Sequence, residues 1–476
     1  MLIAGEASGD LLAAELIQAF RQLPEVQSMP WPPKFFGAGG PRMADAGVEL
    51  LIDLTAHSVF GLTEALAQYG KFKSFFHALF QEAVQRQPEV IVLVDFGGFN
   101  LRFAAAIKRH IRKHAGPFNV WNPRIVYYVS PQVWASRPGR AYRVAGTVDL
   151  LLSIFPFEKD WYATRVPWLR VEFAGHPLMD RHANAECGVG SAEFAGASAL
   201  RTASQSLGEL PSGSSVPPHP GPLPQGEEIP LTGSGQTGSR GFIQPRRTTL
   251  PLPKGEGRGE GEGGGVSPAV CRTAEETNPA TPPSSRPLIV LLPGSRKREI
   301  EAHWPVISEA VRIILARHAV RLRLVLPNLD LAEFAARLGA PMGHLEVRTK
   351  ELAESLSEAS LAIASSGTVT LECALFRVPT VVIYKTSWLT YQIARRIITV
   401  KHIAMPNLLA GETVYPELIQ NDAKPADLAR EALEFLNNPS RVAVLKSKLS
   451  KAVESLGAPG ASRRAAEAVL GMLPRP

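Results

Sequence analysis

The stretch that decides the fold runs from Leu288 to Glu301 and reads LIVLLPGSRKREIE. Its five apolar residues are typical of a buried strand, Pro293-Gly294 ends that strand, and a helical pattern starts near Ile300. Gly294 lets the backbone approach an anion, the following N–H groups and the helix dipole favour negative charge, and Arg296 offers a forked donor to phosphate oxygens. The stretch predicts a phosphate site, although an ordinary strand-to-helix loop with a solvated basic run is the alternative interpretation.

A second junction of the same kind lies further along the chain. The apolar run Leu361–Ala364 ends in Ser365-Ser366-Gly367-Thr368, and a helical segment carrying Glu372 follows. Two strand-to-helix junctions with small residues at the helix entry suit a diphosphate better than one does. In open parallel sheets, ligands bind at the carboxyl ends of the strands, so we expect both junctions to contribute to one site.

Length and composition limit the class of protein. A chain of 476 residues with 45% hydrophobic residues is long enough for two domains. The net charge of +7 and the pI near 9.3 favour an anionic partner: nucleic acid, an acidic membrane surface or a phosphorylated substrate. We rank nucleic acid last because no recognition motif for it is present. The scattered cysteines, Cys187, Cys271 and Cys373, favour a reduced cytosolic setting. No apolar run approaches the roughly 18 residues of a spanning helix.

The first half also alternates strands and helices. The apolar start at Met1–Ala4 is short, so we expect its natural start to lie upstream, and Asp10 is the expected N-cap of the next helix. The strand Glu89–Val94 delivers Asp95 at its carboxyl end, where a carboxylate is a candidate general base. A helix cap or a loop hydrogen bond is the alternative role. His176, between Gly175 and Pro177, is either a ligand contact or a turn residue.

The segment 59–80 is unusually aromatic. Apolar periodicity predicts a helix packed on the core. The alternative is an interfacial segment whose aromatic side chains enter a membrane surface while Lys71 and Lys73 meet anionic head groups. The residues assigned to that membrane or acyl contact are Leu62, Leu66, Tyr69, Phe72, Phe75 and Phe76.

The middle of the chain has a different composition. Residues 185–285 are rich in Pro, Gly and polar side chains and cannot bury a core, so we predict a disordered insertion. The remaining parts, 1–184 and 286–476, each alternate strands with helices. The predicted fold class is α/β, with two doubly wound Rossmann-like domains on either side of this low-complexity insertion. The second of these domains carries both diphosphate junctions, would suit a sugar-nucleotide enzyme, and ends in C-terminal helices.

Eight short motifs, in order, resemble those of one family, lipid-A-disaccharide synthase, which is family 19 of the glycosyltransferases and has the GT-B architecture. They are Gly5-Glu6-Ala7-Ser8-Gly9-Asp10, Gly39-Gly40-Pro41-Arg42-Met43, Asp95-Phe96-Gly97-Gly98-Phe99-Asn100, Ser130-Pro131-Gln132-Val133-Trp134, Gly175-His176-Pro177, Leu292-Pro293-Gly294-Ser295-Arg296, Ser366-Gly367-Thr368 and Pro406-Asn407-Leu408-Leu409. The motifs cover both ends of the chain and skip only the insertion.

The resemblance implies a reaction and its residues. The reaction is inverting transfer of 2,3-diacylglucosamine from its UDP donor to 2,3-diacylglucosamine 1-phosphate, giving a β-1,6-linked disaccharide 1-phosphate and UDP. The domain 1–184 would bind the acceptor, and the domain 286–476 would bind the UDP-sugar. Asp95 would be the catalytic base, with Glu6 and Ser8 near the acceptor. The residues expected to hold UDP are Gly294, Ser295, Arg296, Ser366, Gly367, Thr368, Glu372 and Asn407.

The resemblance also bears on cofactors, partners and location. The chain has no Asp-x-Asp pair for a divalent ion, so we expect a metal-independent enzyme without a cofactor, in which Arg296 and helix N-termini stabilise the leaving group. Acylated substrates imply peripheral contact with the cytoplasmic face of the inner membrane, and the resemblance also allows a homodimer. Two other functions stay open at this point. One is a UDP-N-acetylglucosamine 2-epimerase-like isomerase, and the other is a UDP-binding chain inactivated by N-terminal truncation and the insertion.

Overall fold

The computed structural model describes residues 1–57, 69–186, 286–339 and 344–474. These residues form two open sheets whose strands all run parallel, each covered by helices. The expected fold class, two doubly wound α/β sheets, is confirmed. The expected disordered insertion, with Cys187 and Cys271, lies outside the described residues, although helix α10 continues to Glu186.

The first sheet has the order β3-β2-β1-β4-β5-β6-β7. Its strands are β1 (Leu2–Ala4), β2 (Phe36–Gly39), β3 (Glu49–Asp53), β4 (Val90–Val94), β5 (Arg124–Tyr128), β6 (Leu150–Ser153) and β7 (Arg170–Phe173). The central strands are almost entirely apolar and buried, as a parallel sheet covered on both faces requires. Strand β1 is short, yet it lies in the middle of the sheet, paired with β2 and β4.

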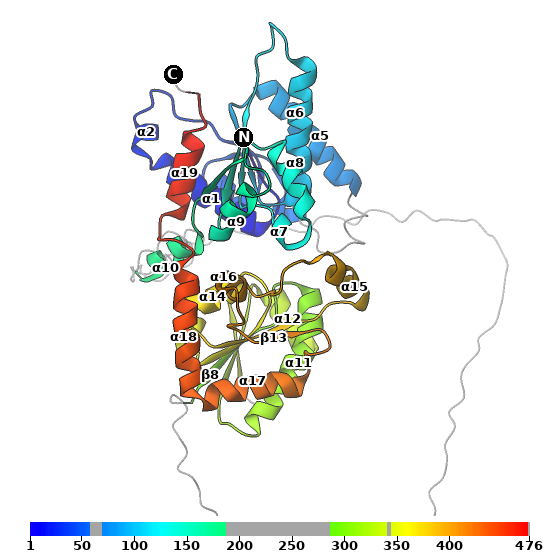
Figure 1. The fold of residues 1–476 in the computed structure, drawn as a ribbon, viewed down its shortest axis with the longest axis vertical. Coiled ribbons are helices and arrows are strands. Elements are labelled where there is room, and N and C mark those ends of the chain that lie inside the picture. The colour runs from blue at the N-terminus through cyan, green and yellow to red at the C-terminus, as the bar shows by residue number, and fades with distance from the viewer. Residues whose placement is uncertain (58–68, 187–285, 340–343, 475–476) are drawn as a thin grey trace, which may run out of the picture. The chain divides into compact units, whose positions relative to one another are not determined.

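The helices that accompany the first sheet cover both of its faces, and Figure 1 shows α1 and α19 on one side and α5, α6 and α8 on the other. They are α1 (Ala7–Arg21), α2 (Pro24–Gln27), α3 (Pro41–Asp45), α5 (Tyr69–Arg86), α6 (Gly97–His114), α7 (Val133–Ser136), α8 (Ala141–Ala145), α9 (Pro156–Ala163) and α10 (Leu178–Glu186), with short 3-10 turns at Thr55–His57 and Pro138–Arg140.

The second sheet has the order β10-β9-β8-β11-β12-β13. Its strands are β8 (Leu288–Leu292), β9 (Arg321–Leu326), β10 (Leu345–Thr349), β11 (Leu361–Ser365), β12 (Thr380–Tyr384) and β13 (Glu417–Ile419). Its helices are α11 (Lys297–Leu315), α12 (Leu329–Arg337), α13 (Leu352–Glu358), α14 (Val369–Leu375), α15 (Trp388–Ile397), α16 (Met405–Ala410), α17 (Pro425–Asn437) and α18 (Pro439–Glu454). Helices α11 and α12 lie on one side of this sheet and α14 and α18 on the other (Figure 1).

The last helix, α19 (Ala461–Leu470), returns to the first sheet and packs against α1. Asp180 of α10 caps it, because its carboxylate accepts hydrogen bonds from the N–H groups of Gly460, Ala461 and Ser462. The end of the chain is therefore tied to the first sheet by a specific cap as well as by apolar packing.

The sequence predicted Asp10 as the N-cap of α1, and this prediction is wrong. Glu6 occupies the N-cap position, and Asp10 lies buried within the first turns of the helix. Its carboxylate accepts hydrogen bonds from the N–H groups of Gly40 at 2.8 Å, Arg42 at 3.1 Å and Met43 at 3.1 Å. Asp10 thus caps α3, about thirty residues further along the chain, and stabilises the carboxyl end of β2.

Candidate active site

Four of the residues selected from the sequence follow the strands at which each sheet reverses its order. In the first sheet this switch point lies between β1 and β4, and in the second between β8 and β11. Glu6 follows β1, Asp95 follows β4, Arg296 follows β8 and Ser366 follows β11. Ligands of doubly wound sheets bind at such switch points, beyond the carboxyl ends of the strands. The sheet topology therefore indicates ligand binding at these four positions independently of any family resemblance.

Asp95 lies on a tight, strained turn. Its φ is 47° and that of Phe96 is 49°, so two consecutive residues with side chains adopt the left-handed conformation. The backbone is fixed on several sides: the Asp95 N–H donates to the Tyr128 carbonyl at 2.9 Å. The Asp95 carbonyl accepts from the Tyr127 hydroxyl and from Asn100 Nδ2. Such a turn persists because its surroundings over-determine it, and it holds the Asp95 carboxyl at the end of the strand.

The electrostatic surroundings of Asp95 suit a proton acceptor. Burial and the neighbouring Glu6 carboxylate raise the pKa of Asp95 to about 6, and the hydrogen bond from the Phe96 N–H offsets only part of that rise. A carboxylate whose pKa approaches the working pH takes up a proton more readily than an ordinary surface Asp. Glu6 is half-buried at the start of α1, and Ser8 is exposed on its first turn.

Gly5 explains why the loop after β1 lies so close to this turn. A Cβ atom added at Gly5 would come within 2.2 Å of the Phe96 ring. The ring of Phe96 therefore lies directly over the Gly5 backbone, and any side chain there would displace it. The two loops that carry Glu6 and Asp95 are packed together through this contact.

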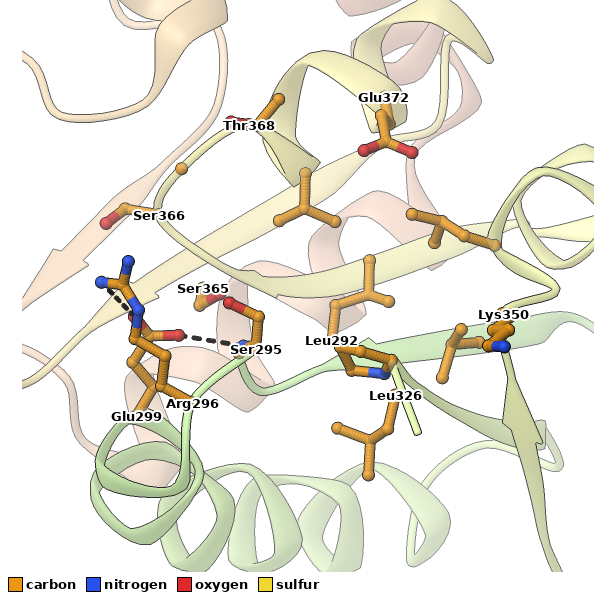
Figure 2. A pocket seen from close by; sticks show the side chains of 16 residues that line it. Leu292, Ser295, Arg296, Glu299, Leu326, Lys350, Ser365, Ser366, Thr368 and Glu372 are labelled. Atoms are coloured by element: carbon orange, nitrogen blue, oxygen red, sulfur yellow. Dashed lines mark hydrogen bonds and ion pairs between the residues drawn. The ribbon is translucent and has the colours of Figure 1, made fainter. Parts of the chain in front are cut away.

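The second sheet carries a cavity of about 500 Å³ at the carboxyl ends of β8, β9 and β11. Figure 2 shows Ser295, Arg296 and Ser366 toward one end and Leu326 and Lys350 toward the other. The lining comprises Leu292, Gly294, Ser295, Arg296, Glu299, Val325, Leu326, Pro327, Lys350, Leu352, Ser365, Ser366, Gly367, Thr368, Val369 and Glu372. The structure thus brings together every residue assigned to UDP from the sequence except Asn407.

The loop after β8 has an internal carboxylate at its anion-binding end. The N–H of Ser295 donates to Glu299 Oε2 at 2.9 Å, and an Arg296 guanidinium nitrogen lies 3.8 Å from Glu299 Oε1 (Figure 2). Gly294 has a φ of 135°, and a Cβ there would approach the Glu299 carboxylate to 2.6 Å. Glu299 is part of the cavity wall although the sequence argument did not select it; its position three residues after Arg296, in the first turn of α11, is the signal that could have identified it.

The loop after β11 forms the facing wall. Ser365 ends the strand, Gly367 has a φ of 138° with open space where a Cβ would point, and α14 begins at Val369. Glu372 projects toward the cavity from this helix (Figure 2), and burial raises its pKa to about 7. A carboxyl group there accepts or donates hydrogen bonds at near-neutral pH.

His303 ties two of these loops together and was missed from the sequence. It is buried in α11, and its Nε2 accepts a hydrogen bond from the Lys385 N–H at 2.9 Å, so Nδ1 carries the proton and donates to the Pro293 carbonyl at 2.7 Å. Burial lowers the pKa of His303. The neutral ring therefore links the loop after β8 to the loop after β12. In the sequence, only its place among the apolar residues of a helical pattern marks it.

Asn407 lies away from the cavity lining. Its Oδ1 accepts from the N–H groups of Val414 and Tyr415, and its Nδ2 donates to the Tyr415 carbonyl and to Glu417 Oε1 at 2.7 Å. The side chain is fully buried. In this structure Asn407 holds the turn between α16 and β13 and does not reach the candidate UDP site.

His176 is also a structural residue in this conformation. Its Nδ1 accepts from the Leu178 N–H at 3.2 Å, its ring lies 5.5 Å from that of Phe155, and burial lowers its pKa to about 4. Of the two roles considered, the structure shows the turn residue.

The aromatic segment is only partly described. Leu62 and Leu66 lie outside the described residues, and Tyr69 begins α5. Phe72, Phe75 and Phe76 are half-buried, and the Phe76 ring packs against Phe99 at 5.4 Å and Phe103 at 5.6 Å. The Phe76 ring thus packs on α6, as expected of a helix packed on the core, while the membrane or acyl contact assigned to these residues stays a prediction.

Within the described ranges no group of three or more His, Cys, Asp or Glu side chains is placed to hold a metal ion. None of the described helices is long and apolar enough to cross a membrane.

Comparison with solved structures shows the fold. A UDP-GlcNAc 2-epimerase from Neisseria meningitidis bound to UDP-GlcNAc superimposes with a TM-score of 0.52 at 10% identity, covering 96% of each chain. An S. aureus MnaA–UDP co-structure gives a TM-score of 0.51 at 12% identity, covering 97% of this chain and 92% of that one. At such low identity these similarities concern the two-domain architecture alone.

Comparison with protein families and curated sequences is more specific. A family model described as lipid-A-disaccharide synthetase matches residues 1–192 and 273–471. The lipid-A-disaccharide synthase of Geobacter sulfurreducens is 32% identical over 477 residues, which cover 99% of this chain and 97% of that protein. Lipid-A-disaccharide synthase 1 of Legionella pneumophila is 29% identical over 479 residues, covering 100% and 97%. The chain belongs to the lipid-A-disaccharide synthase family and is a glycosyltransferase of lipid A biosynthesis with the GT-B fold.

Proposed function

We propose that this chain transfers 2,3-diacylglucosamine from its UDP donor to the 6-hydroxyl of 2,3-diacylglucosamine 1-phosphate, with inversion, giving a β-1,6-linked disaccharide and UDP. The observation that carries the proposal is Asp95: a carboxyl with a pKa raised to about 6, held on a strained turn at the switch point of the first sheet. Family membership supports the substrate class, and Asp95 supports the reaction type.

The donor's nucleotide would occupy the cavity of the second sheet. A volume of about 500 Å³ is in the range of sites for ligands of this size. Arg296, the Ser295 N–H and the Ser366–Thr368 loop suit the diphosphate, because they combine a guanidinium with N–H groups at helix entries. Leu326, Pro327 and Leu352 line the same cavity and would offer apolar contacts to the uracil base, and Glu372 would bond the ribose hydroxyls.

The chemical step would be a single displacement. The Asp95 carboxylate takes the proton from the acceptor 6-hydroxyl while that oxygen attacks the anomeric carbon of the donor sugar. The bond from the anomeric carbon to the phosphate oxygen breaks, and its electron pair leaves with UDP. Attack and departure on opposite faces invert the anomeric configuration, and the proton ends on Asp95.

Stabilisation of the departing UDP would come from the second sheet. Negative charge develops on the β-phosphate as the bond breaks, and Arg296 together with N–H groups of the loop after β8, which line the cavity, would donate hydrogen bonds to it. We propose that this charge stabilisation requires no metal ion. Both sugars carry acyl chains, so we also propose that the enzyme works in peripheral contact with the cytoplasmic face of the inner membrane.

Product analysis tests the proposal. The purified chain is incubated with UDP-2,3-diacylglucosamine and 2,3-diacylglucosamine 1-phosphate in detergent, and the lipid product is analysed by mass spectrometry and NMR. A β-1,6-linked disaccharide 1-phosphate supports the proposal, and an α-linked product excludes a single inverting displacement. The Asp95→Asn variant is the matched control and should give almost no product. Incubation with UDP-GlcNAc alone tests the epimerase alternative, which would yield the 2-epimer without any acylated acceptor.

A further inference from the structure

Helix α15 (Trp388–Ile397) exposes large apolar side chains that the proposed reaction does not use. Trp388 is 71% exposed, Leu389 64% and Ile393 50%, and no residue of the helix is buried. Leu389 and Ile393 are four residues apart, so they lie on the same side of the helix. Scattered apolar residues are normal on a surface, but several on one short helix mark an interaction site.

The stretch of sequence that contains α15 carries charge of a single sign. From residue 373 to residue 411 the sequence contains no Asp or Glu, whereas Arg377, Lys385, Arg395, Arg396 and Lys401 are basic. Neither Arg395 nor Arg396 forms an ion pair with any residue that the structure describes. Helix α15 therefore carries two exposed arginines with no acidic partner among the described residues, and the complement of such a surface is an anionic one.

The arginines share a face with the apolar residues. Arg396 lies three residues after Ile393, and Arg395 lies two turns after Trp388. Long basic side chains beside exposed Trp, Leu and Ile are the arrangement of an interfacial helix, in which apolar groups enter the acyl boundary while guanidinium groups remain at the head groups. A ten-residue helix is about 15 Å long and too short to span a bilayer, so it would lie in the plane of the surface.

The position of α15 relates this face to the candidate donor site. The helix follows β12, whose neighbour β11 delivers the Ser366–Thr368 loop to the cavity. It therefore leaves the second sheet at the edge where the cavity lies, and Figure 1 shows it apart from α11 and α17. The rings of Phe72 and Phe76, by contrast, pack inward in the first sheet.

We propose that α15 is a docking helix for an anionic lipid bilayer surface, with Trp388, Leu389 and Ile393 inserted and Arg395 and Arg396 at the head groups. The inference rests on the proposed function, because acylated substrates at a membrane give such a surface its use.

The experiment is cosedimentation of the full chain with vesicles of phosphatidylglycerol and phosphatidylethanolamine, compared with phosphatidylcholine vesicles. The wild type should bind the anionic vesicles and be released by salt. The Leu389→Ser/Ile393→Ser variant should bind at least about tenfold more weakly. The Arg395→Gln/Arg396→Gln variant should lose about ten- to thirtyfold on anionic vesicles only. Matched controls are Val444→Ser, 59% exposed on α18, and Lys446→Gln/Lys451→Gln on the same helix, which should bind like the wild type.

Transferase activity in detergent micelles separates this inference from the proposed function. The α15 variants should retain that activity, because none of the altered residues lines the cavity or contacts Asp95. Wild-type binding by the Leu389→Ser/Ile393→Ser variant would overturn the inference, as would no vesicle binding by the wild type. If the wild type is a dimer in solution and the Leu389→Ser/Ile393→Ser variant is a monomer, the apolar face of α15 binds a second copy of the chain. That result would also overturn the inference. Absence of activity with intact vesicle binding would count against the proposed function alone.

Discussion

The Glu299 carboxylate accepts a hydrogen bond from the Ser295 N–H at 2.9 Å, at the entry of the helix where the donor diphosphate is proposed to bind. The Glu299 carboxylate thus already accepts the hydrogen bond that the Ser295 N–H would offer to a bound anion. The diphosphate must either displace Glu299 or bind beside its negative charge. In both cases the charge of Glu299 opposes nucleotide binding.

Glu299→Gln should therefore strengthen UDP binding by a few fold, because the amide keeps the shape of the side chain and removes the like charge. Isothermal titration calorimetry with UDP measures the change. Glu301→Gln, an exposed neighbour outside the cavity lining, is the control and should leave the affinity unchanged. Weaker binding by Glu299→Gln would mean that its charge positions Arg296 and does not compete with the ligand.

Arg296→Ala should weaken UDP binding by roughly 10–100-fold, since a forked, charge-assisted contact to the diphosphate is lost. Arg296→Lys should restore only part of the affinity, because an ammonium cannot reproduce the planar fork. Arg298→Ala changes charge equally but lies outside the cavity lining, and it should bind UDP like the wild type. Equal losses for the variants at 296 and 298 would point to a general charge effect.

Asp95→Asn should reduce turnover by at least about 100-fold while UDP affinity stays unchanged.

The same Asp95→Asn substitution should increase the stability of the folded protein at alkaline pH. The pKa of Asp95 rises from 3.8 to about 6 on folding, so its contribution to stability is present below pH 4 and is lost as the pH rises through 6. At pH 8 the Asn variant should be more stable by about 1–3 kcal/mol, a difference that disappears near pH 4. Thermal unfolding at the two pH values measures it, and a less stable variant at pH 8 would contradict the account.

The pH dependence of kcat/KM should report the same carboxyl group. Activity should rise as the pH increases through about 6, because the base acts in its deprotonated form. Glu6→Gln removes a like charge and should move this limb to lower pH. If the pH at which kcat/KM rises is the same in Glu6→Gln as in the wild type, the charge of Glu6 does not raise the pKa of the catalytic base.

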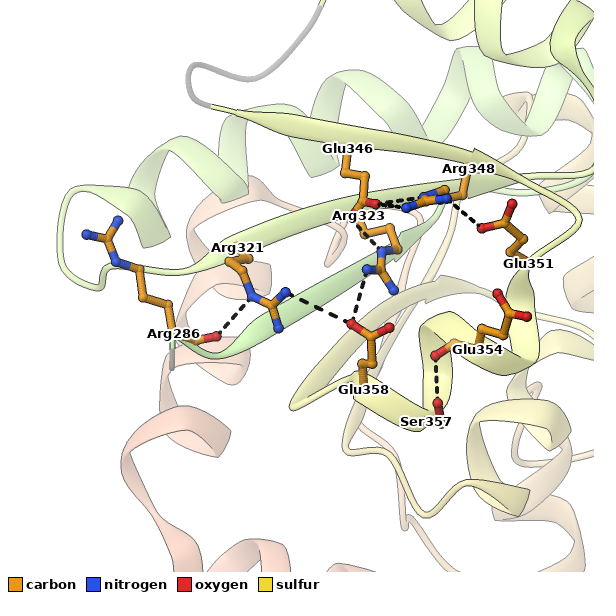
Figure 3. Close-up of polar contacts among 9 residues, drawn as sticks. All are labelled: Arg286, Arg321, Arg323, Glu346, Arg348, Glu351, Glu354, Ser357 and Glu358. Atoms are coloured by element: carbon orange, nitrogen blue, oxygen red, sulfur yellow. Dashed lines mark hydrogen bonds and ion pairs between the residues drawn. The ribbon is translucent and has the colours of Figure 1, made fainter. Parts of the chain in front are cut away.

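The edge of the second sheet offers a stability prediction away from the site. Arg323 is buried and donates to Glu346 at 2.8 Å and to Glu358 at 3.1 Å, as Figure 3 shows. Arg323→Met should destabilise the fold by about 1 kcal/mol without changing UDP affinity. The hydrogen bond from Arg323 lowers the pKa of Glu346 below its ordinary value of 4.5. The stabilisation from this pair is therefore present at pH values above 4.5 and is lost as the pH falls below 4.5 and Glu346 becomes protonated. Urea unfolding of both forms at neutral and acidic pH tests the prediction, and equal stability at neutral pH would contradict it.

Much of the fold was predictable because parallel strands buried on both faces are continuous apolar runs. Strands β8, β4 and β11 and the loops that follow them were identified in this way. Strand β10 was missed because it lies at the sheet edge and alternates apolar with charged residues, as in Leu345-Glu346-Val347-Arg348. The edge strand β3, with an exposed residue at either end, was missed for a similar reason.

The parts of the site that escaped prediction depend on long-range contacts. Asp10 looked like a local cap but bonds N–H groups about thirty residues away. Asn407 carries a motif of the family, yet its amide is occupied by the turn before β13. His303 connects two loops through bonds to Pro293 and Lys385 that no local pattern records. The part of the cavity lining that follows β8 and β11 lay at strand ends that the apolar runs predicted, whereas Lys350 and Leu352, which follow the missed strand β10, were not selected.

The most direct test of the central claim is acceptor-dependent release of UDP. The purified chain is mixed with UDP-2,3-diacylglucosamine in detergent, with and without 2,3-diacylglucosamine 1-phosphate, in the presence of a chelator, and free UDP is measured over time. The account predicts release that requires the acceptor and persists with the chelator. UDP binding without acceptor-dependent release, in conditions where a homologous synthase releases UDP, would contradict it.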